Sequence, residues 1–319
     1  MTINNLVWEE NACDWCGSTE TEIIFEGPDR LEKLPGRFTM VQCVNCGLYR
    51  QNPRLVWTSL EEYYPEDYSS HPRLVKDIPN AWRRLDRRYG PWKRLRAIES
   101  FQKGGRLLEV GCGTGYFLEE ALRSQQWEVS GIEPTTKAAQ YAQENLPAKI
   151  YEGRFSEIIL PAETYDVIAM WNVLEHLDFP IADLRYAFQL LKDDGWLVMA
   201  IPNLESLEAK LFGHYWVGWD LPRHLYIFPH DLLDNILASI GFRVVSRRCI
   251  STSYSVLGHS LDFWSQTWEI SHPRIRKNLL RLYYSFIGRV ALILPLWVLD
   301  RLNTSTIITV FAQKHVPPK

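Results

Sequence analysis

Apolar and polar residues follow two alternating periods between about residue 80 and residue 250. Short apolar runs typical of strands in a parallel sheet alternate with stretches whose apolar residues recur every three or four positions, as in amphipathic helices. This order predicts βαβ units and a mostly parallel sheet in an α/β domain. The predicted strands are 106–111, 129–134, 149–153, 165–171, 195–201 and 242–248, and the predicted helices are 116–125, 137–146, 181–191 and 231–241.

The segments on either side of this region have different patterns. Residues 1–70 contain two Cys-x-x-Cys pairs, and three of their tyrosines lie close together at 63, 64 and 68. From about residue 251 the chain is apolar and helical, and one more strand is predicted over 306–314. We expect this strand to return to the sheet as an edge strand, which makes residues 251–305 a helical insertion. The pattern therefore predicts an N-terminal module over 1–70 and a domain over 71–319.

Composition narrows the class of protein. Hydrophobic residues make up 46% and charged residues 23% of the 319 residues, the balance of a folded protein. The net charge of −3 gives no general attraction to nucleic-acid phosphates, so nucleic acid is not an expected partner. The N-terminus has neither a basic nor an apolar segment typical of a signal peptide, so we expect a cytoplasmic protein.

A glycine-rich loop follows the first predicted strand. Gly111, Gly113 and Gly115 allow a sharp turn and bring backbone N–H groups close to a ligand at the start of a helix. The third glycine comes one residue earlier than in the Gly-x-Gly-x-x-Gly loop of dinucleotide dehydrogenases. Glu109, just before the loop, would repel a pyrophosphate but suits a ligand with ammonium and sulfonium groups. The loop therefore favours S-adenosylmethionine over NAD.

Glu133 ends the second predicted strand, about 20 residues beyond the glycine loop. At that place a carboxylate can accept hydrogen bonds from both ribose hydroxyls of a nucleoside. The alternative interpretation is an ordinary solvated carboxylate at a strand end.

Four segments, LLEVGCGTGYF, GIEP, YDVIAMWNVLEHL and GWLVMAIPN, resemble the successive motifs of class I S-adenosylmethionine-dependent methyltransferases, especially ubiquinone-pathway O-methyltransferases. The resemblance covers about residues 80–250 and implies a Rossmann-like class I methyltransferase sheet. It also implies that Gly111, Cys112, Gly113, Gly115 and Asn172 line the methionine part of the cofactor, while Glu133 contacts the ribose. Many relatives have an acidic residue after the third strand for the adenine amine, whereas this chain has the sequence Glu-Gly-Arg-Phe, so Phe155 is expected to pack on the adenine.

The sequence specifies the catalytic chemistry less closely than the cofactor site. Methyl transfer requires collinear donor and acceptor, and a base only when the acceptor must lose a proton. His176 follows the fourth predicted strand at the carboxyl end of the sheet and is either a general base or a structural histidine. The segment contains no Asn-Pro-Pro-Tyr motif and no catalytic Pro-Cys, which argues against methylation of amide or nucleobase nitrogens and of cytosine C5.

An aromatic segment over 215–225 follows the fifth predicted strand. Trp216 and Trp219 are candidate walls of a small-molecule pocket, with Arg223 and His224 facing the acceptor and His224 a second candidate for catalysis. The alternative interpretation is a loop packed only for stability.

Four cysteines are arranged as two similar turns. Cys13, Cys16, Cys43 and Cys46 form two Cys-x-x-Cys pairs, each followed by glycine, which is the pattern of a closed tetrahedral zinc site of structural type. The pairs and the Tyr-rich segment after them also resemble the N-terminal metal-binding module of many bacterial class I methyltransferases, including sugar C-methyltransferases. Those sugar enzymes have a further C-terminal domain that the 319 residues do not contain.

The apolar insertion allows two interpretations. Residues 282–299 are nearly all apolar and follow a basic stretch, but Arg289 and Pro295 interrupt them, which argues against a transmembrane helix. Residues 274–299 could lie at the inner face of a membrane and collect a lipid-linked acceptor. The alternative is a helix pair packed on the domain or on a second subunit in a homodimer.

These observations predict methyl transfer from S-adenosylmethionine to oxygen or carbon of a small molecule, such as a sugar, a polysaccharide precursor or a lipid-linked species. Two rival hypotheses are a non-catalytic module that binds S-adenosylmethionine or a partner, and a nucleic-acid methyltransferase. The intact glycines and Glu133 favour catalysis over the first, and the acidic net charge argues against the second.

Overall fold

A computed structural model of the chain describes residues 6–64, 74–250, 254–268 and 272–315. These residues divide into two compact units, each built from separate stretches of the sequence. We call the first the knuckle unit, which comprises residues 6–63, residues 201–233 and the described residues of 254–308. The second is the sheet unit, which comprises residues 64, 74–200, 234–250 and 309–315.

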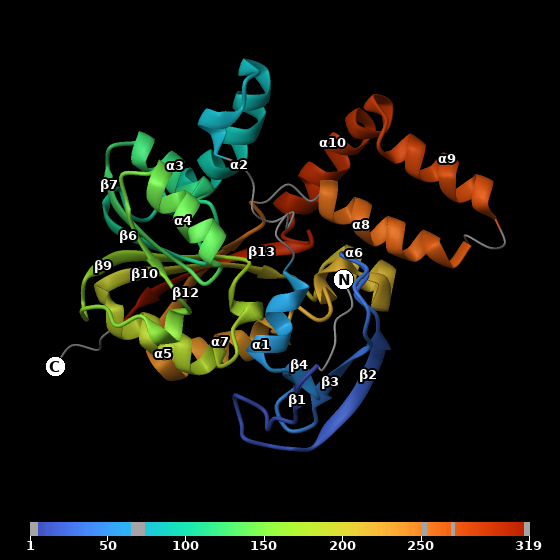
Figure 1. The fold of residues 1–319 in the computed structure, drawn as a ribbon, viewed down its shortest axis with the longest axis horizontal. Helices are drawn as coiled ribbons and strands as arrows, with labels where there is room; N and C mark the ends of the chain where they lie inside the picture. Colours follow the sequence, from blue (N-terminus) through green and yellow to red (C-terminus); the bar gives the residue numbers. More distant parts are fainter. Residues whose placement is uncertain (1–5, 65–73, 251–253, 269–271, 316–319) are drawn as a thin grey trace. The chain divides into compact units, whose positions relative to one another are not determined.

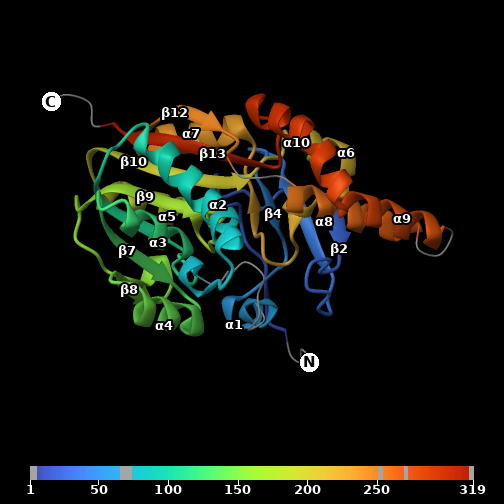
Figure 2. The ribbon, with the colours of Figure 1, turned by 90° about the horizontal axis from the view of Figure 1, so that it is seen from above.

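A seven-stranded sheet forms the centre of the sheet unit, in the order β12-β13-β10-β9-β6-β7-β8. Figure 2 labels these strands except β6, which is labelled in Figure 1. The pairs β6–β7, β7–β8, β6–β9 and β9–β10 are parallel, whereas β12 and β13 are antiparallel. The strands are β6 (Gly105–Val110), β7 (Trp127–Glu133), β8 (Lys149–Glu152), β9 (Tyr165–Trp171), β10 (Leu191–Pro202), β12 (Phe242–Arg248) and β13 (Ile307–Lys314).

Helices cover both faces of this sheet. The helices α2 (Ala81–Glu99), α3 (Tyr116–Arg123) and α4 (Thr136–Asn145) lie on one face, and α5 (Pro180–Leu190) and α7 (His230–Ile240) lie on the other (Figure 1). Their apolar faces point inward, as in α3, where Phe117, Leu118 and Ala121 are buried. The predicted α/β fold class is therefore confirmed, with the strands and helices in the expected order.

The expected position of the last strand is wrong. β13 lies between β10 and β12, so it is an inner strand and β12 is the edge. The five consecutive residues from Ile308 to Ala312 are buried, which requires a strand covered on both faces. In β12, by contrast, only Phe242 is fully buried, as suits an edge strand.

The knuckle unit contains a four-stranded antiparallel sheet in the order β11-β4-β3-β2, which the sequence analysis did not predict. Its strands are β2 (Thr21–Gly27), β3 (Phe38–Cys43), β4 (Tyr49–Gln51) and β11 (Tyr226–Ile227). A short pair, β1 (Trp8–Glu9) with β5 (Arg54–Leu55), and the helix α1 (Trp57–Leu60) complete the N-terminal stretch. The rings of Phe38 and Tyr63 meet edge to face in its core, with centroids 5.4 Å apart.

Four further helices belong to the knuckle unit. They are α6 (Leu207–Phe212), α8 (Tyr254–Ser265), α9 (Pro273–Tyr283) and α10 (Phe286–Arg301), and the last three form the insertion that precedes β13. Within the described residues, no single helix is long and apolar enough to cross a membrane. Only α9 and α10 taken together have that length and composition, and they are bent by 69° where they meet (Figure 1).

Candidate active site and metal centre

The glycine loop lies between β6 and α3, at the carboxyl end of the parallel strands. Gly111, Gly113 and Gly115 have φ values of 67°, 54° and 82°, a region that residues other than glycine rarely adopt. A Cβ atom at Gly111 would lie 2.6 Å from Val173 Cγ2, and one at Gly115 would lie 2.2 Å from Leu146 Cδ1. Both backbone conformation and space therefore require glycine at these two positions, and the loop presents its backbone at the start of a helix.

Glu133 holds this loop in place. Its carboxylate is only 3% exposed, and its Oε2 accepts a hydrogen bond from the backbone N–H of Gly113 at 2.8 Å. Its Oε1 accepts one from the N–H of Thr135 at 2.9 Å. Glu133 is thus not a solvated strand-end carboxylate. Each oxygen has a second lone pair, so the predicted contact with ribose hydroxyls is compatible with these bonds.

Glu109, the last acidic residue before the loop, is 4% exposed, and its Oε2 has no hydrogen-bond partner. Burial raises the pKa of Glu109 well above its usual range, and the nearby Glu133 adds to this effect while Arg94 opposes it. A buried carboxylate oxygen without a donor fits a cationic ligand group. The ammonium or sulfonium of S-adenosylmethionine is such a group.

Arg94 is a neighbour of this site that sequence reasoning missed. It comes from α2, and its guanidinium lies 5.0 Å from the ring centroid of Trp171 at the end of β9. Burial lowers the pKa of Arg94, while the charge of Glu109 raises it. The only signal in the sequence was a polar helical stretch before the first motif, and nothing in it singles out Arg94 among several arginines.

The other predicted cofactor residues also belong to the sheet unit. Asn172 directly follows β9 with a φ of 58°, a left-handed conformation that asparagine adopts more readily than most other non-glycine residues. Cys112 is buried, and its Sγ occupies the space that a Cβ at Gly131 would need, at 2.6 Å. Phe155 is buried with its ring centroid 5.1 Å from that of Tyr186. The roles of these three residues toward the cofactor stay predictions.

His176 ends a single helical turn, Leu174–His176, just after β9. Its Nδ1 lies 3.1 Å from the hydroxyl of Tyr64, a second residue that the sequence analysis did not identify. This hydrogen bond orients the imidazole ring. The arrangement is compatible with a base and with a structural histidine.

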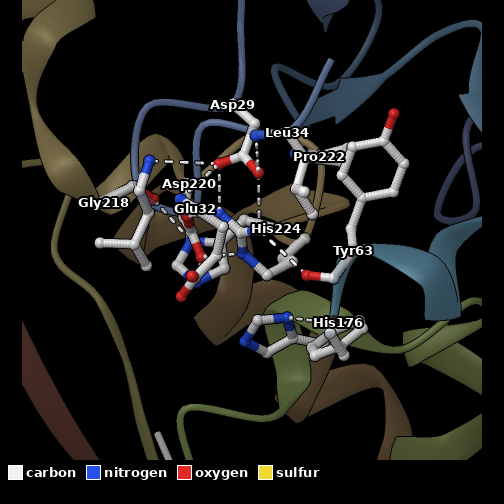
Figure 3. Close-up of polar contacts among 12 residues, drawn as sticks. Asp29, Glu32, Leu34, Tyr63, His176, Gly218, Asp220, Pro222 and His224 are labelled. Atoms are coloured by element: carbon white, nitrogen blue, oxygen red, sulfur yellow. Dashed lines mark hydrogen bonds and ion pairs between the residues drawn. The ribbon is translucent and has the colours of Figure 1, made fainter. Parts of the chain in front are cut away.

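Arg223 is fully buried in the knuckle unit and has all five of its N–H donors engaged there. Its partners Asp29, Tyr63 and Asp220 are labelled in Figure 3. Two of the donors reach the carboxylate of Asp29, at 2.7 and 3.1 Å, and two reach that of Asp220, at 2.7 and 3.0 Å. The fifth binds the carbonyl oxygen of Tyr63 at 3.1 Å. Burial alone would lower the pKa of Arg223, but the two carboxylates raise it. The geometry shows a residue that joins three chain segments, and a direct contact with an acceptor stays a prediction.

Trp216, Trp219 and His224 are also buried in the knuckle unit. The two indole rings meet edge to face at 5.7 Å, and Trp219 Nε1 donates to the carbonyl of Gly213 at 3.0 Å. His224 Nδ1 donates to the carbonyl of Gly218 at 2.7 Å, and burial lowers the pKa of His224. The ring is therefore neutral with its proton on Nδ1, which leaves the lone pair on Nε2.

The four predicted cysteines come together in the knuckle unit. Their sulfur atoms all lie within 4.8 Å of one another, with Cys13 and Cys46 at 3.5 Å and Cys16 and Cys43 at 3.5 Å. A tetrahedral zinc site with Zn–S bonds of about 2.3 Å needs sulfur separations of roughly this size. The four side chains can therefore hold one metal ion with little movement.

Two matching backbone turns create this arrangement. The N–H of Gly17 donates to the carbonyl of Cys13 at 2.8 Å, and the N–H of Gly47 donates to that of Cys43 at 2.9 Å. Both glycines have positive φ, 73° and 80°. The second turn follows the end of β3. The sheet that contains β3, which the sequence analysis did not predict, therefore positions half of the cysteine ligands.

A comparison with known families decides what kind of domain surrounds the glycine loop. A family model described as a methyltransferase domain matches residues 81–247, slightly more than half of the 319 residues. The chain belongs to this methyltransferase family. Its methyltransferase domain includes every predicted cofactor residue, together with His176 and the segment from Trp216 to His224. The four cysteines and the helices α8, α9 and α10 lie outside the match.

Curated relatives agree with this family. The ubiquinone biosynthesis O-methyltransferase of Burkholderia multivorans is 32% identical over 143 residues, which cover 42% of this chain and 61% of that protein. Its counterpart in Burkholderia ambifaria (strain MC40-6) is 28% identical over 144 residues, covering 43% and 62%. The matched part of the chain thus spans less than two thirds of these relatives.

Among solved structures, a candidate sarcosine dimethylglycine methyltransferase from Galdieria sulphuraria superimposes with a TM-score of 0.50 at 15% identity. The superposition covers 81% of this chain and 98% of that one. At this identity the likeness concerns the fold alone.

Proposed function

We propose that the chain transfers a methyl group from S-adenosylmethionine to an oxygen or carbon atom of a small-molecule acceptor. The observation that carries this proposal is the glycine loop held by Glu133, next to the buried Glu109 oxygen that has no donor. The match to the methyltransferase family and the curated O-methyltransferase relatives support the proposal.

The residues of the sheet unit would divide the binding of the cofactor among them. The backbone of Gly111, Gly113 and Gly115 would cradle the methionine part, Glu109 would compensate its positive charge, and Glu133 would accept the ribose hydroxyls. When bound, S-adenosylmethionine supplies an electrophilic methyl group on a sulfonium. The protein then has to align the acceptor atom with that group and exclude water.

His176 is the proposed base for an acceptor that must lose a proton. An imidazole has an ordinary pKa near neutrality, and the hydrogen bond with Tyr64 fixes the orientation of its ring. The base would take the proton of a hydroxyl or of an enolisable carbon while the new bond to the methyl group forms.

The acceptor class is inferred from chemistry and from relatives. The two relatives described above act, by name, in ubiquinone biosynthesis as O-methyltransferases, which favours a hydroxyl acceptor. A sugar, a polysaccharide precursor or a lipid-linked species with such a hydroxyl remains our proposed acceptor.

We also propose that the four cysteines hold a structural zinc ion. Four thiolates complete the coordination of a tetrahedral metal and leave no position for a substrate, so the ion would stabilise the two turns and take no part in the reaction. The closeness of the four sulfur atoms supports this role.

Isothermal titration of the purified chain with S-adenosylmethionine and with S-adenosylhomocysteine tests the cofactor part. We expect micromolar binding of both, and no binding of NAD. If neither S-adenosylmethionine nor S-adenosylhomocysteine binds, the proposal is refuted. A radiolabelled methyl assay with phenolic and sugar acceptors, in wild-type protein and in the His176→Ala variant, then tests the acceptor class and the base.

A further inference from the structure

The helix α10 exposes a continuous apolar stripe. Phe286 is 83% exposed, Ile293 is 62% exposed and Leu294 is 66% exposed. The exposed apolar positions recur at helical spacing, so they share one face of the helix. They are Phe286, Ile287, Val290, Ile293, Leu294, Trp297 and Val298.

The helix α9 is held by contacts with α8, and the guanidinium of Arg289 in α10 lies 5.8 Å from the ring centroid of Tyr254 in α8. The rings of Tyr254 and Tyr283 stack with centroids 4.8 Å apart, and each tyrosine hydroxyl donates to the backbone carbonyl of the other residue. Arg276 pairs with Asp262 of α8 at 2.8 Å, and Leu296 is buried. The stripe therefore belongs to an anchored helix, and its exposure within the knuckle unit does not come from a loose segment.

The helix α9 is strongly basic. It contains four cations and no acidic residue, although the whole chain has a net charge of −3. Arg274, Lys277 and Arg281 are exposed and recur at three- and four-residue spacing, so they form a row along one face. Two exposed apolar residues, Ile275 and Leu282, lie one position further along the helix from the ends of this row.

We propose that α9 and α10 dock the chain onto the surface of a bilayer that contains anionic phospholipid. The apolar stripe of α10 enters the boundary between headgroups and acyl chains, while the cationic row of α9 stays at the level of the lipid phosphates. Exposed aromatic residues such as Tyr284 and Trp297 are well suited to that depth. The bend of 69° lets the two helices lie along the surface without crossing the bilayer.

Charge complementarity favours a lipid surface over a second copy of the chain. A symmetric pairing of two such helix pairs brings the same four-cation helix into the contact twice, and like charges repel. An anionic bilayer complements the row and the stripe together. This inference does not depend on the proposed methyl transfer, because it uses only residues of the knuckle unit and needs no cofactor.

Sedimentation of the full-length chain with unilamellar vesicles tests the proposal. We expect the protein to co-sediment with vesicles of mixed phosphatidylglycerol and phosphatidylcholine at an ionic strength of about 0.1 M. Binding is expected to weaken strongly with phosphatidylcholine alone and with rising salt. A protein that stays in the supernatant with anionic vesicles overturns the proposal.

Matched variants distinguish vesicle binding through the stripe from nonspecific hydrophobic binding. The Ile293→Glu change places a charge in the stripe and is expected to weaken vesicle binding at least about tenfold. Ile159→Glu, the same change at an isoleucine that is 96% exposed in the sheet unit, is expected to leave binding unchanged. Equal binding of both variants to vesicles overturns the assignment of this face.

Charge variants test the cationic row. The combined change of Arg274, Lys277 and Arg281 to glutamine is expected to weaken binding to anionic vesicles about a hundredfold. A control removes the same charge from the exposed residues Arg83, Lys103 and Lys210 and is expected to bind nearly as wild type.

Sedimentation velocity without vesicles decides between lipid and a second copy. We expect the wild type and the Ile293→Glu variant to have the same oligomeric state. A dimer that the Ile293→Glu change dissociates, together with absence of vesicle binding, would make this face a subunit interface and overturn the proposal.

Discussion

At the scale of single residues, Glu133 has two tasks that a single carboxylate can combine. It already accepts the N–H groups of Gly113 and Thr135, so it shapes the loop before any ligand binds. A cofactor that also uses Glu133 would find its acceptor buried and oriented in advance, which reduces the entropy lost on binding.

We predict that Glu133→Gln weakens binding of S-adenosylmethionine by one to two orders of magnitude, because hydrogen bonds to a charged group contribute about 1.5–3 kcal/mol. The amide keeps one acceptor oxygen and turns an NH2 group toward a backbone donor. Isothermal titration measures the change. Glu128→Gln, on the exposed side of the same strand, is the control and should bind as wild type. Equal affinities of the two variants would contradict the role of Glu133.

The burial of Glu109 leads to a prediction about how the affinity for S-adenosylmethionine depends on pH. In the free protein burial raises the pKa of Glu109 well above 4.5, so over a range of pH above that value the carboxyl retains its proton. A bound cation stabilises the carboxylate, so binding releases this proton. The affinity for S-adenosylmethionine should therefore rise with pH through that range, by at most about tenfold per pH unit, and level off above the raised pKa.

Calorimetry across this pH range, in buffers of different ionisation enthalpy, counts the released proton. The Glu109→Gln variant should bind more weakly and with an affinity that no longer depends on pH in the same window. Protonation of Glu109 should also affect stability. In this pH range the folded protein binds more protons than the unfolded chain, so the free energy of unfolding falls as pH rises. A pH-dependent affinity that persists in Glu109→Gln would assign the proton to another group.

Residues with a local signal could be predicted for the site, and residues that arrive through tertiary packing could not. Gly111, Gly113 and Gly115 show their role in the spacing of one loop, and Glu133 is identified by its distance from that loop. Arg94 and Tyr64 both precede β6; Arg94 lies outside every motif, and the Tyr-rich segment that contains Tyr64 was noted only for its resemblance to a metal-binding module. Asp29 lies 194 residues from Arg223, its partner, so no pattern in either segment connects them.

At the scale of elements, the cysteine turns are small and depend on their ligands. Two short turns held by a few backbone hydrogen bonds each cannot bury an apolar core, so a bound metal would contribute most of their local stability. The same elements carry the end of β3, so loss of the metal should also loosen the sheet β11-β4-β3-β2.

We predict that Cys46→Ser lowers the zinc content from about one ion per chain to near zero and lowers the melting temperature, since four thiolates are needed to close a structural site. Elemental analysis and circular dichroism measure the two effects. Cys249→Ser, which removes a buried thiol outside the cluster, is the control and should keep its metal. Metal retained in Cys46→Ser and lost in Cys249→Ser would show that the cluster is not the metal site.

The central strands of the parallel sheet could be predicted because β9 and most of β10 are buried on both faces and are nearly continuous apolar runs. The sheet of the knuckle unit was not predicted, for the opposite reason. Its strand β2 has exposed residues such as Ile23 and Ile24, and β11 has only two residues. Its pairing of β11 with β4 joins segments about 175 positions apart in the chain, which periodicity cannot show. The place of β13 between β10 and β12 is likewise a property of the assembled sheet.

At the scale of the whole molecule, the two units are interleaved along one chain. Three elements pass from one unit into the other, namely β10, α7 and β13. A strand or helix that belongs to both units cannot melt in one and remain intact in the other without breaking its own hydrogen bonds. The covalent arrangement therefore couples the stabilities of the knuckle unit and the sheet unit.

We predict that the chain unfolds in a single cooperative transition. Cobalt substituted at the four cysteines gives a charge-transfer absorbance that reports on the knuckle unit, while far-ultraviolet circular dichroism follows the helices and the seven-stranded sheet. The two melting curves should coincide. S-adenosylmethionine at about 100 times its dissociation constant should raise both midpoints together, because its binding adds about 2.7 kcal/mol to the folded state. A ligand of the sheet unit stabilises the cysteine site only if the two units unfold together. A cobalt signal that is lost at a lower temperature than the circular dichroism, and that the ligand does not shift, would therefore show that the units unfold separately.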